Sequence, residues 1–258
     1  MDGLLITILI VTGFLVYKMI SSSRKQEGYK RWKATGSGDT ANEETAGNKW
    51  KHGAWLRHAL GVTTPKARTY PVFDEEAVVW CAGLLGVEAV RLKEILQDVS
   101  SHYREFWIRK RKGGYRMISA PDKELKSIQD TIYHRILLPV NVHPVATGFR
   151  RQHSIVDNVR PHLGKRCVLK TDIHDFFLSI RSPRVKQTFE NIGYPKNISK
   201  VLGELCCRRR HLPQGASTSP ALSNIIAYEM DRKLAVMAEE FGLAYTRYAD
   251  DLTFSGDV

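Results

Sequence analysis

Residues 245–254 read YTRYADDLTF, and this stretch decides how the rest of the chain is interpreted. Polar and apolar residues mix on both sides of Ala249-Asp250-Asp251, a pattern typical of two strands joined by a tight turn. Two adjacent Asp residues at such a turn have two interpretations. They form a solvated turn, in which Asp is a favoured residue, or they belong to a site that needs paired carboxylates.

A third carboxylate ends another strand pattern, CVLKTD at residues 167–172. We expect residues 167–173 to form a buried strand with Asp172 near its end. Two-metal phosphoryl transfer needs carboxylates from separate strands that converge on two cations about 4 Å apart. Mg²⁺ suits this chemistry because it prefers oxygen ligands and keeps substrate phosphates in its coordination shell. Asp172, Asp250 and Asp251 are therefore candidates for such a site.

Helical and strand patterns alternate along the chain, without an internal repeat. This mixture predicts an α+β fold, with α/β as the alternative. The expected elements are a helix capped by Asp74 with Val78, Val79, Leu84 and Leu85 on its apolar face, a helix at 87–99, a hairpin at 106–118 around Gly113-Gly114, a helix at 125–138, and one long helix at 219–241.

The run LLITILIVTGFLVYKMI at residues 4–20 predicts a transmembrane anchor. Its 17 residues would span about 26 Å as a helix, near the lower limit for a bilayer. Lys and Arg residues follow the run, so the positive-inside rule places the N-terminus outside and the remainder in the cytoplasm. The alternatives are a buried core helix and an interfacial helix.

This reading predicts three parts. Residues 1–20 are the transmembrane anchor of a single-pass membrane protein. Residues 21–53, rich in Gly, Ser, Thr, Lys and Glu, are a flexible linker. Residues 54–258 are the globular domain, on the cytoplasmic side.

The chain holds 39 Lys and Arg against 27 Asp and Glu residues, a formal net charge of +12. An excess of this size favours a polyanionic partner, either nucleic acid or an anionic membrane surface. A solvated basic surface is the alternative, because charge does not identify a fold.

Residues 248–251 (YADD) resemble the YxDD box of reverse transcriptases, and further stretches resemble the companion boxes in the right order. These are WIRKRKGGYRMISAP at 107–121, ATGFRRQHSIVDNVRPH at 146–162, TDIHDFFLSI at 171–180 and LPQGASTSPALSN at 212–224. Residues 158–162 (NVRPH) are similar to the NAxxH signature of retron enzymes, with Val in the Ala position. The chain therefore resembles bacterial retron-type reverse transcriptases from about Trp55 to its end.

The resemblance implies the fingers and palm of a right-hand polymerase. It implies an RNA-directed DNA polymerase that takes an RNA template and primer with dNTPs, makes a DNA product, and uses two Mg²⁺ ions, with Mn²⁺ as a substitute. A retron enzyme would copy a cognate non-coding RNA into single-stranded DNA, often in anti-phage defence. The alternatives are a group II intron or other defence-associated reverse transcriptase, and a membrane-bound RNA-binding fragment with weak catalysis.

The same resemblance assigns the metal site and the sugar contact. Asp172, Asp250 and Asp251 match the metal ligands, and Ile173 contributes its backbone carbonyl. Phe177 matches the aromatic residue that packs under the incoming sugar and excludes a 2′-hydroxyl. Core packing is the alternative for both aromatic residues, and we retain it for Phe176.

Other residues match contacts with nucleotide and RNA. Lys110 and Arg116 match the fingers residues that grip the triphosphate, although Arg109, Arg111 and Lys112 stand beside Lys110. Gln214 and Gly215 match the turn that contacts dNTP and template. Asn158, His162 and Arg208 are the candidates for RNA or template binding. The run 208–210 (RRR) has two open interpretations, contact with template phosphates and a solvated loop.

Val258 lies only seven residues after Asp251. The resemblance implies a further primer grip and a helical thumb, absent from this chain. A missing C-terminal part or a separate chain would supply them. Without a thumb we expect weak holding of primer and template.

Overall fold

The computed structural model describes residues 72–110 and 113–257. The predicted anchor at residues 4–20 and the predicted linker at 21–53 lie outside the described residues. Among the helices of the described part, none combines the length and the apolar character needed to cross a bilayer.

The first two predicted helices are present, with one correction to each. Helix α3 (Glu75–Leu85) begins at the predicted cap, where the Asp74 carboxylate accepts a hydrogen bond of 2.8 Å from Ala77 N. Val79 does not face the core as predicted, since it is 57% exposed. Helix α4 (Ala89–Gln97) ends before residue 99, and the chain continues as a 3₁₀ turn, η2 (Val99–His102).

The predicted hairpin is confirmed as strands β1 (Tyr103–Arg109) and β2 (Tyr115–Pro121). The predicted helix at 125–138 is confirmed as α5 (Lys123–Ile132), which continues into a π-helical turn, η3 (Tyr133–Leu137). The Asp122 carboxylate caps α5 by accepting a hydrogen bond from Leu125 N.

Two helices that the sequence analysis did not predict complete the helical core. Helix α8 (Ser182–Ile192) packs against α9 (Lys196–Leu205), and α9 also contacts α3, α4 and α5. Val185, Phe189, Val201, Leu202 and Leu205 are fully buried at this junction. Apolar residues at helical spacing thus bury one stripe of each helix, as expected for amphipathic helices.

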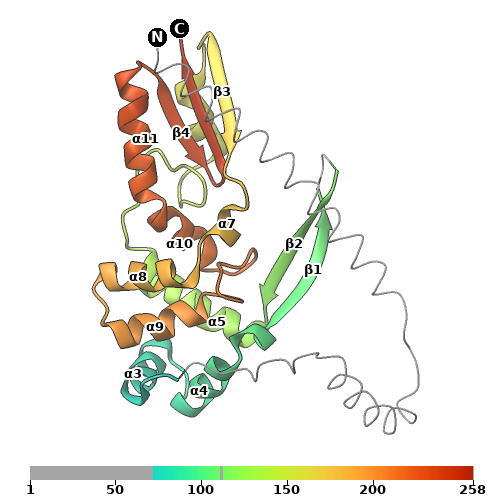
Figure 1. The fold of residues 1–258 in the computed structure, drawn as a ribbon, viewed down its shortest axis with the longest axis vertical. Helices are drawn as coiled ribbons and strands as arrows, with labels where there is room; N and C mark the ends of the chain where they lie inside the picture. The colour runs from blue at the N-terminus through green and yellow to red at the C-terminus, as the bar shows by residue number, and fades with distance from the viewer. Residues whose placement is uncertain (1–71, 111–112, 258) are drawn as a thin grey trace, which may run out of the picture. The chain divides into compact units, whose positions relative to one another are not determined.

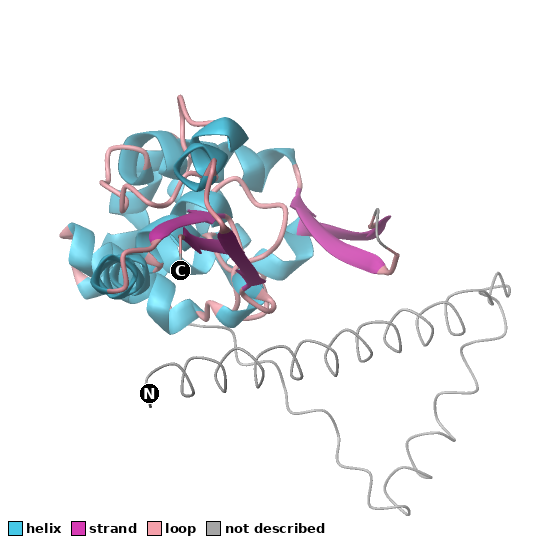
Figure 2. Cartoon of the chain, turned by 90° about the horizontal axis from the view of Figure 1, so that it is seen from above, coloured by secondary structure: helices cyan, strands magenta, loops and turns pink. Residues whose placement is uncertain are grey.

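A small antiparallel sheet, here called the central sheet, forms the second half of the fold. Its strands are β3 (Cys167–Asp172), β4 (Ala244–Tyr248) and β5 (Asp251–Gly256), in the order β3-β5-β4. Helix α11 (Tyr228–Glu240) lies along β4 (Figure 1). In Figure 2 the strands form two separate groups, the hairpin and the central sheet, among many helices. Antiparallel strands with segregated helices confirm the α+β prediction.

Two predictions about this half were wrong in part. Strand β3 is not buried, because α11, α6 and η4 pack on the opposite edge strand, β4; Val168 is 57% and Leu169 45% exposed. The predicted long helix at 219–241 is divided into α10 (Ser219–Ile226) and α11 at Ala227. The ψ angle of Ala227 is −5°, far from the helical value, so the helix is interrupted there.

Three short segments connect the two halves. They are α6 (Ile155–Val159), the 3₁₀ turn η4 (Arg160–His162) and α7 (Phe176–Ser179). Helix α6 starts with a capping box, in which Ser154 and Asp157 exchange hydrogen bonds between side chain and backbone. Because η4 contacts β4 and β5, this connection holds the central sheet from one side.

Candidate active site

Residues 248–251 form a two-residue turn between β4 and β5, here called the YADD turn. Tyr248 and Asp251 are paired as the last and first residues of their strands, and Ala249 and Asp250 lie between them. Ala249 has a φ of 58°, in the left-handed region. That conformation costs a residue with a Cβ atom roughly 1 kcal/mol, so the surrounding structure must hold it.

The three predicted carboxylates meet at this end of the central sheet. Asp172 lies directly opposite Asp251 in the register of β3 and β5. Residues opposite one another in an antiparallel pair have Cβ atoms about 5 Å apart. Ile173 N donates a hydrogen bond of 2.7 Å to the carbonyl of Asp250, which ties the end of β3 to the turn. Sequence positions 172 and 250–251 are therefore brought together as predicted.

Negative charge accumulates at this position. Burial is the main reason why the pKa of Asp250 lies above its ordinary value, and the carboxylates of Asp251 and Asp172 raise it further. Arg116 of β2 acts in the opposite direction on the same carboxyl group. Lys170 Nζ lies 3.2 Å from Asp251 Oδ2. A carboxylate group under such repulsion is stabilised by a bound cation.

The residue types suit a hard divalent cation, but they do not form a closed cage. Among the described residues, no group of three or more His, Cys, Asp or Glu side chains is arranged to hold a metal ion. Mg²⁺ commonly takes one or two protein carboxylates and completes its shell with water and substrate phosphates. The carboxylates therefore fit such an ion in kind. The assignment of Asp172, Ile173, Asp250 and Asp251 as ligands stays a prediction.

The two aromatic residues after β3 differ in exposure. Phe176 is 7% exposed and belongs to the core, in agreement with the packing role kept for it. Phe177 is partly buried, and its ring centroid lies 5.9 Å from that of Phe149. The sugar contact of Phe177 stays a prediction.

Gly215 lies against strand β2 of the hairpin. It has a φ of 125°, and an added Cβ would lie 2.9 Å from both Ser119 O and Ile118 Cγ2. The carbonyl of Gln214 accepts a hydrogen bond of 2.8 Å from Ser119 N. Glycine is therefore needed here for close approach to β2. A nucleotide contact of Gln214 and Gly215 stays a prediction.

The two predicted triphosphate residues lie on the hairpin. Arg116 is exposed on β2. Lys110 lies at the hairpin turn, where its backbone N–H donates to Gly114 O and its carbonyl accepts from Gly113 N. Their contact with a triphosphate stays a prediction.

Asn158 and His162 of the retron-like signature are placed inside the protein. The His162 ring is bonded to the hydroxyls of Ser255 and Thr246, at 2.6 Å and 2.8 Å. Burial lowers the pKa of His162, so its ring is neutral at physiological pH. The Asn158 side-chain carbonyl accepts a hydrogen bond of 2.9 Å from the Thr147 hydroxyl. The His162 bonds attach η4 to β4 and β5, and the Thr246 hydroxyl, which also donates to the Asn158 backbone carbonyl at 3.2 Å, attaches α6 to β4. Direct binding of RNA by the two side chains stays a prediction.

The three consecutive arginines are separated by the fold. Arg208 is 9% exposed, forms an ion pair with Glu105 and lies over the Tyr103 ring, so it holds the helical core to the hairpin. Arg209 and Arg210 form an exposed turn with φ angles of 47° and 67°. Arg209 and Arg210 therefore expose their charged groups to solvent. The Arg208 guanidinium is buried, so its exposure does not support the predicted template contact.

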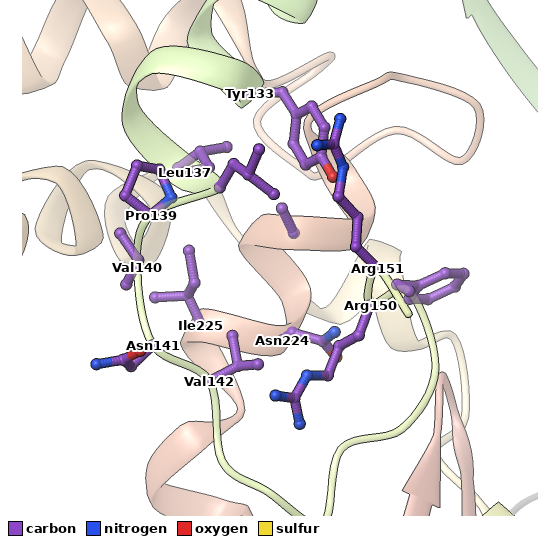
Figure 3. A pocket seen from close by; sticks show the side chains of 13 residues that line it. Tyr133, Leu137, Pro139, Val140, Asn141, Val142, Arg150, Arg151, Asn224 and Ile225 are labelled. Carbon is purple, nitrogen blue, oxygen red and sulfur yellow. The ribbon is translucent and has the colours of Figure 1, made fainter. Parts of the chain in front are cut away.

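A pocket of about 220 Å³ opens beside the site (Figure 3). Its walls include Leu137, Val142 and Ile225, while Arg150 and Arg151 line it together with Asn224. The Arg150 guanidinium donates to the carbonyl of Ala146 at 3.2 Å. Asn224 is shared with the network behind the YADD turn, because its side-chain amide donates to Gly148 O.

Sequence reasoning missed the residues that hold the turn from behind. The side chains of Arg247 and Asp231 form a fully buried ion pair, and Asn224 joins it. Residues 247 and 231 lie in separate elements, and no local pattern relates them. The only available signal was an arginine placed within a strand otherwise rich in apolar and aromatic residues.

Comparison with known proteins identifies the relatives. The sequence profile described as "Reverse transcriptase (RNA-dependent DNA polymerase)" matches residues 108–257. The Retron Ec86 reverse transcriptase of Escherichia coli is 38% identical over 66% of this chain and 53% of its own length. The Retron Mx65 and Mx162 reverse transcriptases of Myxococcus xanthus are 39% and 32% identical, over 60% and 90% of this chain and 41% and 52% of their own lengths. The chain thus spans about half the length of these relatives.

Proposed function

The chain belongs to the reverse transcriptase family, as a member of the bacterial retron type, and on this premise we propose that it carries the fingers and palm of an RNA-directed DNA polymerase. The observation that carries the proposal is the meeting of Asp172 and Asp251 across β3 and β5, with Asp250 in the turn beside them. Carboxylates from separate strands are what two-metal nucleotidyl transfer requires. The reaction joins a dNTP to a primer on an RNA template and releases pyrophosphate.

The family implies dependence on divalent metal, and we propose two Mg²⁺ ions, with Mn²⁺ as a substitute. Bound metal would activate the primer hydroxyl as the nucleophile and neutralise negative charge on the leaving pyrophosphate. Arg116, already close enough to lower the pKa of Asp250, would neutralise the triphosphate, and Lys110 would assist it from the hairpin turn. The turn formed by Gln214 and Gly215 would contact the nucleotide and the template.

We propose that the template is a cognate non-coding RNA, copied into single-stranded DNA in the context of anti-phage defence. Support comes from the retron relatives. The test uses the full-length protein with an RNA template, an annealed primer and labelled dNTPs. We expect DNA product that depends on both RNA and Mg²⁺. Binding of RNA without any incorporation would instead favour a catalytically weak RNA-binding protein.

Replacement of Phe177 by Ala is expected to relax selection against ribonucleotides. The partly exposed ring is proposed to fill the space that a 2′-hydroxyl needs. Removing it should raise the ratio of rNTP to dNTP incorporation by about tenfold or more, the usual range for steric discrimination in an apolar pocket. The measurement is kcat/KM for matched rNTP and dNTP pairs.

Leu178→Ala serves as the control for this variant. Leu178 follows Phe177 on the same short helix and is 42% exposed, so its truncation should leave the rNTP to dNTP ratio unchanged. An unchanged ratio in Phe177→Ala as well would assign Phe177 to core packing.

We also propose that residues 4–20 anchor the protein in the bacterial inner membrane with its polymerase domain in the cytoplasm. Support comes from the apolar run and from the positive charges that follow it. The protein should stay with membranes during a high-salt wash, because salt screens basic contacts but does not weaken apolar insertion. Deletion of residues 1–20 should release it. Release of the intact protein by salt alone would contradict the anchor.

A further inference from the structure

Arg247 is a fully buried cation placed directly behind the YADD turn. Its side chain and that of Asp231 are both 0% exposed. Arg247 Nε donates to Asp231 Oδ1 at 2.8 Å, and Nη2 donates to Oδ2 at 2.6 Å. The guanidinium also lies 5.7 Å from the centre of the Phe176 ring. This is a bidentate pair, the geometry in which arginine binds a carboxylate most strongly.

The third guanidinium nitrogen of Arg247, Nη1, contacts the turn itself. Nη1 donates to the carbonyl of Ala249 at 2.9 Å and to Asn224 Oδ1 at 3.0 Å. Ala249 is the residue with the left-handed backbone, and it immediately precedes Asp250. The bond to its carbonyl therefore acts on the most constrained point of the turn.

Gly148 confines the same turn from another side. A Cβ atom at Gly148 would lie 2.6 Å from Ala249 N, so its backbone packs directly on the turn. The Gly148 carbonyl accepts a hydrogen bond of 2.9 Å from Asn224 Nδ2. Thr147 N donates to the carbonyl of Arg247 at 2.9 Å, and Arg247 N donates to Val145 O at 2.8 Å. Asn224 thus links the arginine to the segment that covers the turn.

A stability role alone does not explain a charged pair at this position. Replacing a buried ion pair with apolar residues of similar volume is often neutral or stabilising, because both charges must be desolvated. What apolar side chains cannot supply is four directed donor contacts on three different partners. The directed contacts of Arg247 therefore suit a role in fixing the backbone geometry of the YADD turn.

We propose that Arg247 is a positioning residue for the carboxylates of the YADD turn. This proposal rests on the proposed function. Arg247 holds the Ala249 carbonyl, so that Asp250 and Asp251 keep their placement beside Asp172. Asp231 orients the guanidinium, and Asn224 transmits the constraint to Gly148. Arg247 touches neither metal nor nucleotide in this role.

The decisive variant is Arg247→Lys, which keeps the charge but cannot make the same set of contacts. We expect kcat for RNA-templated extension to fall by about 100-fold, the cost of a displacement of about 1 Å at reacting groups. The KM for dNTP and the affinity for RNA should change less than about threefold, because neither ligand loses a contact. Binding of Mn²⁺, measured by electron paramagnetic resonance, should weaken.

Tyr245→Phe is the matched control. The Tyr245 hydroxyl donates to Asp231 Oδ1 at 3.0 Å, so this variant removes a bond from the same buried carboxylate and none from the turn. It should lower the melting temperature while leaving kcat and Mn²⁺ binding close to wild type. Circular dichroism establishes that both variants are folded.

The outcomes separate this proposal from the function on which it rests. Wild-type protein that incorporates no dNTP on RNA contradicts the polymerase function, and Mn²⁺ binding then decides the positioning role by itself. A folded Arg247→Lys protein with wild-type Mn²⁺ affinity, and with kcat within threefold of wild type where activity exists, overturns the positioning role. Loss of kcat in Tyr245→Phe to the same extent also overturns it, because the effect would then follow from packing around Asp231.

Discussion

Replacement of Asp250 by Asn is expected to abolish DNA synthesis while leaving the protein as stable as before, or more stable. The exchange keeps the size of the side chain but removes a charged metal ligand. Metal catalysis of this kind contributes several kcal/mol to the transition state, which corresponds to a loss of about 10³-fold or more in kcat. Primer extension on an RNA template measures this loss.

The expected gain in stability follows from the sign of the pKa shift. Burial and the neighbouring carboxylates of Asp251 and Asp172 raise the pKa of Asp250 above its value in the unfolded chain. The folded state therefore holds its proton more tightly, and the ionised form at neutral pH opposes folding. A neutral Asn removes that opposition, so the melting temperature should stay the same or rise. The contribution of Asp250 to stability should correspondingly fall as the pH rises between its unfolded and folded pKa values, so the advantage of Asp250→Asn over the wild type should grow over that range.

Asp257→Asn is the matched control for this experiment. Asp257 follows β5 and pairs with Lys165 Nζ at 2.7 Å, on the exposed surface. The same chemical change there should leave extension unaffected. If Asp250→Asn extends the primer as well as Asp257→Asn does, Asp250 is not a ligand of the metal site.

The sequence was most informative where chemistry is local. An adjacent Asp pair at a strand-turn-strand pattern predicted the YADD turn, and an apolar strand ending in Asp172 predicted its partner across the sheet. Caps such as Asp74 were also readable, because a capping contact spans only three residues. These features depend on neighbours in the chain, so a single sequence contains them.

It was least informative where the outcome depends on distant packing. An apolar strand is predicted to be buried whether or not other elements cover it, and α11, α6 and η4 pack on β4 rather than on β3. Arg208 reads as a template contact within an RRR run, yet Glu105 from the hairpin removes it from the surface. The bonds from the His162 ring to hydroxyls of β4 and β5 were likewise not predictable from the sequence, and RNA binding by Asn158 and His162 stays a prediction. In each case the deciding partner is far away in sequence.

The buried pair of Arg247 and Asp231 gives the second large effect. Replacing Asp231 by Asn should lower the free energy of unfolding by about 3–5 kcal/mol, because it leaves a buried guanidinium without its counter-charge. Urea unfolding measures this loss. Glu229→Gln is the control on the same helix, since Glu229 forms a bidentate but exposed pair with Arg232. Such surface pairs contribute little, so that variant should unfold close to wild type.

Replacing both partners together should separate stability from placement of the turn. The double variant Arg247→Met with Asp231→Leu removes both buried charges, so much of the stability lost in Asp231→Asn should return. Extension activity should not return, because Met offers no donor to the Ala249 carbonyl or to Asn224. Recovery of stability and activity together would mean that the pair only fills space. A loss in Asp231→Asn no larger than that in Glu229→Gln would mean that the guanidinium finds another counter-charge.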